Sequence, residues 1–104
     1  MKTGWTAPAL LLLAASAQAQ AQTQSALSVK SLAATCANCH GTDGRTVEGS
    51  AVPSLAGMPR EYMVAQLQAF KAGTRPATVM HQLSKGFSDS QVEQIAGYFA
   101  AQKK

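Results

Sequence analysis

The sequence has few charged, aromatic and sulfur-bearing residues, and each shortage disfavours a class of protein. Only 13% of the 104 residues are charged, and the nine Lys and Arg residues form no run longer than Lys103-Lys104, which disfavours a nucleic-acid-binding protein. Two cysteines are too few for a multi-disulfide scaffold. A glycine-rich dinucleotide fingerprint is also missing from the sequence, so this chain is not expected to bind a flavin itself.

Long hydrophobic runs are absent as well. The longest apolar run, Ala9 to Ala17, is interrupted by Ser16 and is shorter than the roughly 20 apolar residues that cross a bilayer. Residues 1–21 instead have the layout of a cleaved secretory signal peptide, because Lys2 precedes the run and small-x-small cleavage sites follow it. A buried N-terminal helix is the alternative. The sequence therefore predicts export to the periplasm, an oxidising space, of one domain at residues 22–104.

The remaining sequence has the periodicity of helices. Apolar residues recur with helical spacing in residues 28–38, 59–72 and 89–101, and a short helix fits residues 76–85. No segment alternates as a strand does, so the predicted fold class is all-α. Residues 41–58 form a long irregular loop, and loops of this length in small domains are usually functional. A domain this small also usually needs a metal, a disulfide or a cofactor for stability.

Residues at the ends of these segments support the helix assignments. Pro59 and Pro76 are suited to the first position of the second and third helices. Gly73 is suited to ending the second helix. Ser88 and Gln91 have the spacing of a capping box at the start of the last one.

Cys36, Cys39 and His40 form the most specific motif, Cys-x-x-Cys-His, which matches the attachment site of c-type haem. Two thiols three positions apart lie on one helical face, so both can reach the vinyl groups of one porphyrin, and His40 can bind the iron from the proximal side. The alternatives are a dithiol redox pair, a simple disulfide, or half of a zinc site for which only His81 remains as a further ligand.

An electron-transferring haem needs a second axial ligand, and a methionine thioether raises its reduction potential. Met63 lies on the apolar face of its predicted helix, which favours a core position, and Met58 follows His40 closely in the sequence. Met80 is far enough along the chain to return on the distal side of the haem, and it is the predicted ligand. His81 is the rival, but neighbouring residues on a helix point about 100° apart, so only one of the two can face the iron.

These features resemble the class I c-type cytochromes over essentially all of residues 22–104. The sequence resembles in particular the haem subunit of flavocytochrome c sulfide dehydrogenase. The residues that carry the resemblance are the motif itself, Leu32 to Cys36, Pro53 to Gly57, Phe70 to Gly73, Met80 to Ser88 and Ala96 to Phe99.

The resemblance implies a fold of about four helices around one covalently bound haem c. Cys36 and Cys39 would hold the haem, and His40 and Met80 would be the axial ligands of its iron. The carbonyl of Pro53 would accept a hydrogen bond from His40, which fixes the ring and raises its basicity.

Further residues acquire weaker roles from the resemblance. The first and last helices are expected to cross near Gly97, with Tyr98 and Phe99 as packing residues. Candidate partners for the haem propionates are Arg60, Tyr62 and Arg75, of which at least two are expected to be solvated.

The implied function is electron transfer, because iron with two strong axial ligands has no open site for a substrate. The chain would be no enzyme on its own. It could be the electron-accepting subunit that partners a sulfide-oxidising flavoprotein, or a free soluble carrier between respiratory complexes. A haem enzyme or gas sensor would need a missing or labile sixth ligand, which Met80 disfavours.

Overall fold

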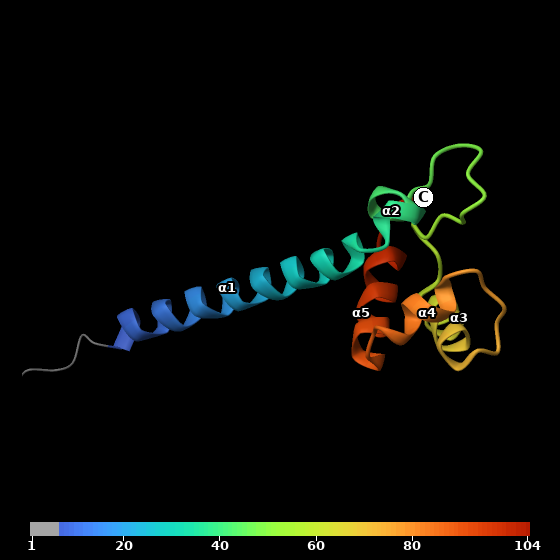
Figure 1. The fold of residues 1–104 in the computed structure, drawn as a ribbon. Coiled ribbons are helices and arrows are strands. Elements are labelled where there is room, and N and C mark those ends of the chain that lie inside the picture. Colours follow the sequence, from blue (N-terminus) through green and yellow to red (C-terminus); the bar gives the residue numbers. More distant parts are fainter. Residues whose placement is uncertain (1–6) are drawn as a thin grey trace, which may run out of the picture.

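The computed structural model describes the backbone of residues 7–104 and the side chains of residues 12–104. Every regular element within residues 7–104 is helical, which confirms the all-α prediction. Figure 1 shows α1 extending as a long rod from a body formed by the later helices. The elements are α1 (Ala7–Ala34), α2 (Ala37–His40), the short 3-10 helix η1 (Thr42–Gly44), α3 (Arg60–Ala72), α4 (Met80–Lys85) and α5 (Asp89–Ala100).

Helix α1 begins much earlier than the sequence predicted. Alanine, leucine and glutamine fill most of its 28 residues, and these are good helix formers. Pro8 stands in the first turn, where a missing N–H breaks no helical hydrogen bond. Residues 12–28 are exposed, so the alternative of a buried N-terminal helix is wrong for them. Lys2 lies outside the described residues, and the signal peptide at residues 1–21 stays a prediction.

The other end of α1 was predicted at residue 38 but lies at Ala34. After this residue the backbone hydrogen bonds join residues three apart instead of four. Thr35 N donates to Leu32 O (3.3 Å), and Cys36 N donates to Ala33 O (3.1 Å). The Thr35 hydroxyl also donates to Leu32 O at 2.7 Å and occupies a carbonyl that a longer helix would use. The haem motif therefore lies in a turn and in the separate short helix α2.

Two helix starts also differ from the prediction. Pro59 has extended backbone angles (φ −56°, ψ 133°) and precedes α3, which starts at Arg60. Helix α4 starts at Met80 and not at Pro76, because Gln82 N and Leu83 N bond to the carbonyl of Val79 and no earlier turn forms. Thr78 and Val79 are β-branched, which weakens helix formation just before this point.

The ends that rest on capping chemistry were predicted correctly. Gly73 ends α3 in the left-handed conformation (φ 78°). At the start of α5, Gln91 N donates to the Ser88 hydroxyl (3.2 Å), and Ser88 N donates to the Gln91 side-chain oxygen (2.9 Å), which completes the capping box.

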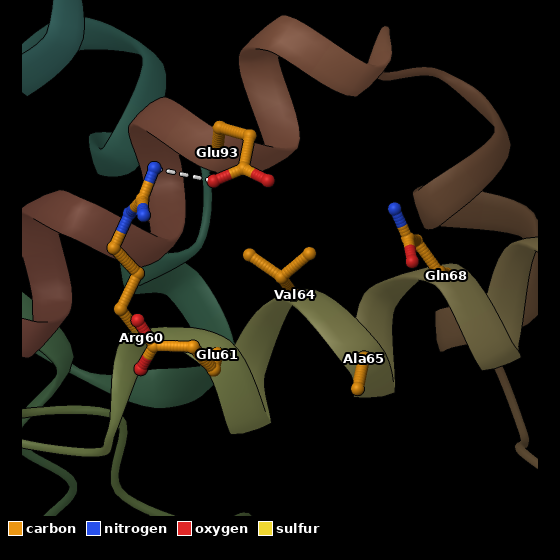
Figure 2. Close-up of a pocket in the computed structure, with 6 residues that line it drawn as sticks. All are labelled: Arg60, Glu61, Val64, Ala65, Gln68 and Glu93. Atoms are coloured by element: carbon orange, nitrogen blue, oxygen red, sulfur yellow. Dashed lines mark ion pairs between the residues drawn. The ribbon is translucent and has the colours of Figure 1, made fainter.

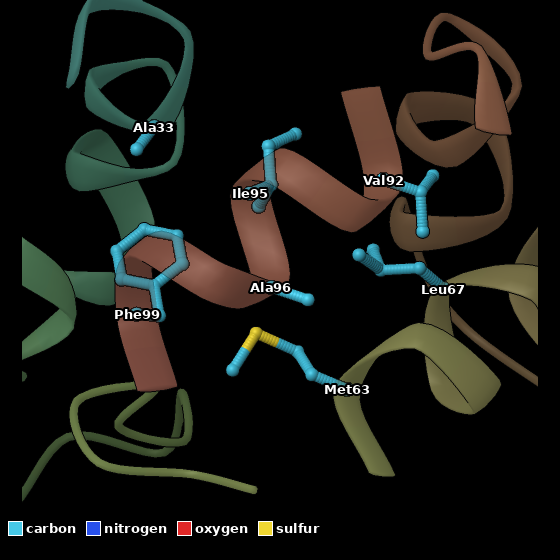
Figure 3. Close-up of a cluster of buried hydrophobic side chains, with 7 residues drawn as sticks. All are labelled: Ala33, Met63, Leu67, Val92, Ile95, Ala96 and Phe99. Carbon is cyan, nitrogen blue, oxygen red and sulfur yellow. The ribbon is translucent and has the colours of Figure 1, made fainter. Parts of the chain in front are cut away.

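The hydrophobic core lies between the end of α1, one face of α3 and the inner face of α5 (Figure 3). Phe99 is 1% exposed and lies near the end of α5, below Ala33 of α1 in this view. The buried cluster consists of Ala33, Met63, Leu67, Val92, Ile95, Ala96 and Phe99. The packing role predicted for Phe99 is confirmed.

The first and last helices were expected to cross near Gly97 because its missing side chain permits a close approach, and this role of Gly97 was predicted wrongly. A Cβ atom built on Gly97 would meet only the Nε of Arg60 within 4 Å, at 3.8 Å, so this position faces α3. Helices α1 and α5 meet instead where Ala33 approaches Phe99 (Figure 3). Alanine there provides the small side chain that the close approach requires.

Candidate haem site

The haem motif is held in one tight helical turn. His40 N donates to Cys36 O at 2.9 Å, and Gly41 N donates to Ala37 O at 3.0 Å. Both thiols are free, with Cys36 half-buried and Cys39 exposed. Burial raises the pKa of the Cys36 thiol, and its contact with the Thr35 hydroxyl (3.9 Å) partly offsets this rise.

His40 is the buried member of the motif, at 9% exposure. Its Nδ1 lies 2.7 Å from the carbonyl oxygen of Pro53, so the contact that the resemblance implied is present. A carbonyl only accepts, so Nδ1 must carry the proton. The unprotonated Nε2 then keeps its lone pair for a metal.

Two glycines make the loop at residues 41–58 possible. Gly41 has φ 81°, and a Cβ atom there would lie 1.9 Å from the carbonyl oxygen of Arg45. Gly44 has φ 76°, and a Cβ atom there would lie 2.7 Å from the Phe99 ring. Both positions therefore need glycine for its conformational freedom and for its missing side chain.

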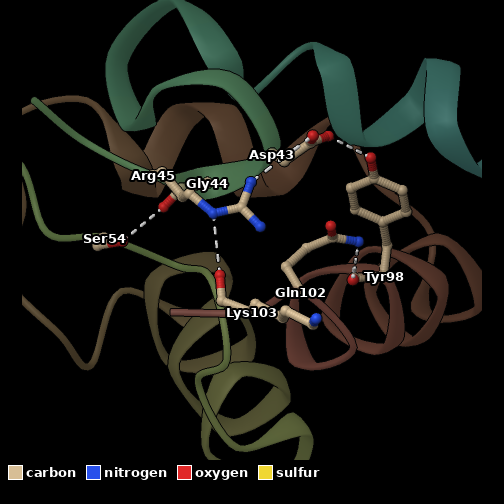
Figure 4. A network of polar contacts seen from close by, with 7 residues as sticks. All are labelled: Asp43, Gly44, Arg45, Ser54, Tyr98, Gln102 and Lys103. Carbon is tan, nitrogen blue, oxygen red and sulfur yellow. Dashed lines mark hydrogen bonds and ion pairs between the residues drawn. The ribbon is translucent and has the colours of Figure 1, made fainter.

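A network of polar contacts ties this loop to α5 and to the residues after it (Figure 4). The Tyr98 hydroxyl donates to Asp43 Oδ1, and this bond raises the pKa of Tyr98. Arg45 Nε donates to Lys103 O at 2.9 Å. The sequence reasoning missed this network, since partners 55 and 58 residues apart leave no local pattern.

The candidate second ligands occupy different environments. Met63 is 3% exposed in the core, as predicted. Met58 and Met80 are both partly buried beside the core, and Met80 is the first residue of α4. The Nδ1 atom of His81 is buried without a hydrogen-bond partner among the described residues. The assignment of the iron ligands stays a prediction.

The candidate propionate partners are all exposed, as predicted for at least two of them. Arg60 forms an ion pair with Glu93 on α5. Arg75 donates to the Gln66 side chain and stacks on a ring, with its guanidinium carbon 4.5 Å from the Phe70 centroid. Their role toward the propionates stays a prediction.

The Arg60–Glu93 ion pair borders a shallow hollow of about 220 Å³ between α3 and α5 (Figure 2). Of the residues predicted to contact the haem, the propionate candidate Arg60 lines it, whereas Cys36, Cys39, His40 and Met80 do not. The lining residues are Arg60, Glu61, Val64, Ala65, Gln68 and Glu93.

The residues present fit a covalently attached haem. The two free thiols are the groups that c-type attachment needs. They precede His40, whose Nδ1 is already hydrogen-bonded to Pro53 O, as is usual for a histidine that binds a metal. Three large apolar side chains around α3 and α4 are about half exposed, namely Tyr62 (51%), Val79 (52%) and Leu83 (52%). A flat apolar macrocycle could cover such surface.

The zinc alternative lacks its further ligands. Among the residues that the structure describes, no three His, Cys, Asp or Glu side chains are placed to hold a metal ion together.

Residues 26–102 match the cytochrome c family. The chain is 43% identical over 68 residues to the cytochrome subunit of sulfide dehydrogenase from Chlorobaculum tepidum, a match that covers 65% of this chain and 60% of that one. It is 41% identical over 68 residues to the thiosulfate dehydrogenase electron acceptor from Stutzerimonas stutzeri, covering 62% of this chain and 31% of that one. The chain thus spans 60% of the first relative and about a third of the second.

The fold is also similar to a solved structure, the cytochrome c4 of Acidithiobacillus ferrooxidans. The TM-score is 0.60 at 36% sequence identity, and the match covers 64% of this chain and 37% of that one. Within residues 7–104, no helix combines the length and the apolar character needed to cross a membrane.

The family match extends from the end of α1 to the residue pair after α5, so it includes the motif, the loop and the core. The helical architecture agrees with it independently of the motif. Proteins of this family bind haem c covalently and carry electrons. The chain belongs to the cytochrome c family and is an electron-transfer protein.

Proposed function

We propose that this chain carries one covalently attached haem c and transfers electrons in the periplasm, with His40 and Met80 as the axial ligands. The single Cys-x-x-Cys-His motif supports one haem, and the signal-like residues 1–21 support export. When bound, the haem supplies a one-electron couple between Fe(III) and Fe(II).

The observation that carries this proposal is the 2.7 Å contact between His40 Nδ1 and Pro53 O. It orients the ring and leaves Nε2 as the nitrogen available to iron. Cys36 and Cys39 would hold the macrocycle through thioether bonds to its vinyl groups. Met80 would be the second iron ligand, which would keep out water and other ligands and raise the reduction potential.

Replacing Met80 with alanine tests the sixth ligand. We expect the oxidised protein to lose the charge-transfer band of a thioether-bound Fe(III). Its reduction potential should also fall, by a sizeable part of the roughly 0.8 V range that axial ligands span. Visible spectra and a redox titration of the haem-loaded protein measure both effects.

The matched controls are Met58→Leu and Met63→Leu, which should leave the band and the potential nearly unchanged. Met63 serves the core, so its replacement should change stability more than spectra. Loss of the band in Met58→Leu with retention in Met80→Ala would transfer the ligand role to Met58.

We propose further that the physiological partner is a flavoprotein, with this chain as the electron-accepting subunit of a sulfide dehydrogenase. Sulfide is oxidised at the flavin of the partner, and this chain takes up the electrons one at a time. The 43% identity to the Chlorobaculum tepidum subunit supports this role. A free-standing soluble cytochrome c is the second candidate, supported by the similarity to a thiosulfate dehydrogenase electron acceptor and to cytochrome c4.

A pulldown from the native periplasm with the haem-loaded protein distinguishes the two roles. For a subunit, we expect a flavin spectrum to elute together with the haem bands, and added sulfide to reduce the haem within the complex. An unrelated periplasmic haem protein, immobilised in the same way, is the control. A lone haem protein that sulfide reduces only slowly would contradict the subunit role and favour the free carrier.

A further inference from the structure

The position of the Pro53 carbonyl is set by its neighbours in the loop. The carbonyl of Pro53 and the N–H of Ser54 belong to one planar peptide unit, which is joined directly to the Ser54 Cα, so anchoring the Ser54 side chain limits how far this unit can tilt. The Ser54 hydroxyl donates to the carbonyl of Gly44 at 2.7 Å (Figure 4). Leu55 N (2.7 Å) and Ala56 N (3.2 Å) donate to the same oxygen.

Gly44 itself is well anchored. It is buried, its left-handed backbone (φ 76°) lies against the Phe99 ring, and it ends η1. Its neighbour Asp43 accepts the hydrogen bond of Tyr98 on α5. The hydroxyl of Ser54 thus connects the peptide that follows Pro53 to a fixed point in the fold.

We propose that Ser54 is a positioning residue for the haem iron. Its bond to Gly44 holds the Pro53 carbonyl against His40 Nδ1, and this lowers the reduction potential of the haem. The inference rests on the proposed ligation of iron by His40. A hydrogen bond from Nδ1–H to a carbonyl makes the imidazole more basic, and a more basic ligand stabilises Fe(III) over Fe(II).

The backbone bonds of Leu55 and Ala56 do not replace this contact. They hold the backbone beyond Ser54, from which the Pro53 peptide unit is separated by both backbone rotations of Ser54, whereas the hydroxyl holds the side chain on the Ser54 Cα itself. Without the hydroxyl we therefore expect the loop to keep its path while the hydrogen bond to His40 becomes longer and more mobile.

The test compares Ser54→Ala with Ser54→Thr in the haem-loaded protein, since threonine retains the donor hydroxyl. For Ser54→Ala we expect the Fe(II)/Fe(III) ratio at a fixed applied potential to rise about threefold, which is about 28 mV at 59 mV per tenfold change. Ser54→Thr should remain near the parent value. Ser90→Ala, which removes an exposed hydroxyl on α5, should also leave the potential unchanged.

Nuclear magnetic resonance of the reduced protein, with histidine labelled by ¹⁵N, gives a readout independent of the potential. We expect the Nδ1 proton of His40 to exchange with deuterium several-fold faster in Ser54→Ala than in the parent. An unchanged potential together with an unchanged exchange rate, even with lower stability, would overturn the positioning role.

The same spectra separate this proposal from the ligation on which it depends. A His40 ring bound to iron shows the large ring-current shifts of a group beneath a porphyrin. Absence of these shifts in the parent protein would overturn the ligation by His40 and the role of Ser54 together. Their presence without an effect of Ser54→Ala would overturn only the role of Ser54.

Discussion

The Cys36→Ala/Cys39→Ala protein is expected to contain no covalently bound haem. Thioether bonds need the two sulfur atoms, and the sequence holds no other cysteine that could replace them. Any haem that remains bound through His40 alone should be released when the chain is denatured. Intact-mass measurement and a haem stain after a denaturing gel check this result.

The single variants and a neighbouring substitution are the controls for this experiment. Cys36→Ala and Cys39→Ala should each keep one thioether, at lower yield. Asn38→Ala changes an exposed side chain between the two cysteines and should attach haem normally. Haem that survives denaturation in the double variant would contradict attachment through these thiols.

Replacing Phe99 with alanine is expected to lower the free energy of unfolding by about 3–5 kcal/mol. The ring is 1% exposed, contacts the buried cluster and makes an edge-to-face contact with Tyr98 at 5.4 Å between centroids. A small domain has a total stability of only about 5–15 kcal/mol, so this loss is a large share of it. Guanidinium unfolding of the haem-loaded protein, followed by far-ultraviolet circular dichroism, measures the change.

Phe70→Ala is the matched control, because it removes the same ring from a position that is only half-buried beneath Arg75. We expect it to cost clearly less than Phe99→Ala, since less apolar surface is exposed to water by the change. Equal losses in the two variants would mean that the contact of α5 with α1 and α3 does not dominate the stability.

The sequence predicted best those helices whose ends depend on nearby residues. Helix α5 has both members of its capping box within four residues, and α3 ends at a glycine that the chain itself provides, so periodicity and local chemistry were sufficient. The end of α1 depended on the hydroxyl of Thr35, and the start of α4 on the carbonyl of Val79. Such competition between side-chain and backbone bonds is not visible in a hydrophobic pattern.

The residues of the candidate site were likewise predicted where the local sequence was sufficient, and missed where only the fold brings them together. The pairing of Cys36, Cys39 and His40 is local, so the motif indicated haem directly. The contact of His40 with Pro53, thirteen residues away, followed only from the family resemblance. Tyr98 was expected to pack, but its bond to Asp43 could not be predicted, because only the folded chain brings the two residues together.

The contacts of the loop with the end of the chain also have a consequence for biosynthesis. Arg45 precedes its hydrogen-bond partner Lys103 by 58 residues. Gly57 N donates to the carbonyl of Phe99, which also comes much later in the chain, at 2.9 Å. Under the proposed export the amino-terminal part enters the periplasm first, so Cys36 and Cys39 are present there before α5 can complete these contacts. During that interval the two thiols belong to an open chain, in which they are accessible for haem attachment.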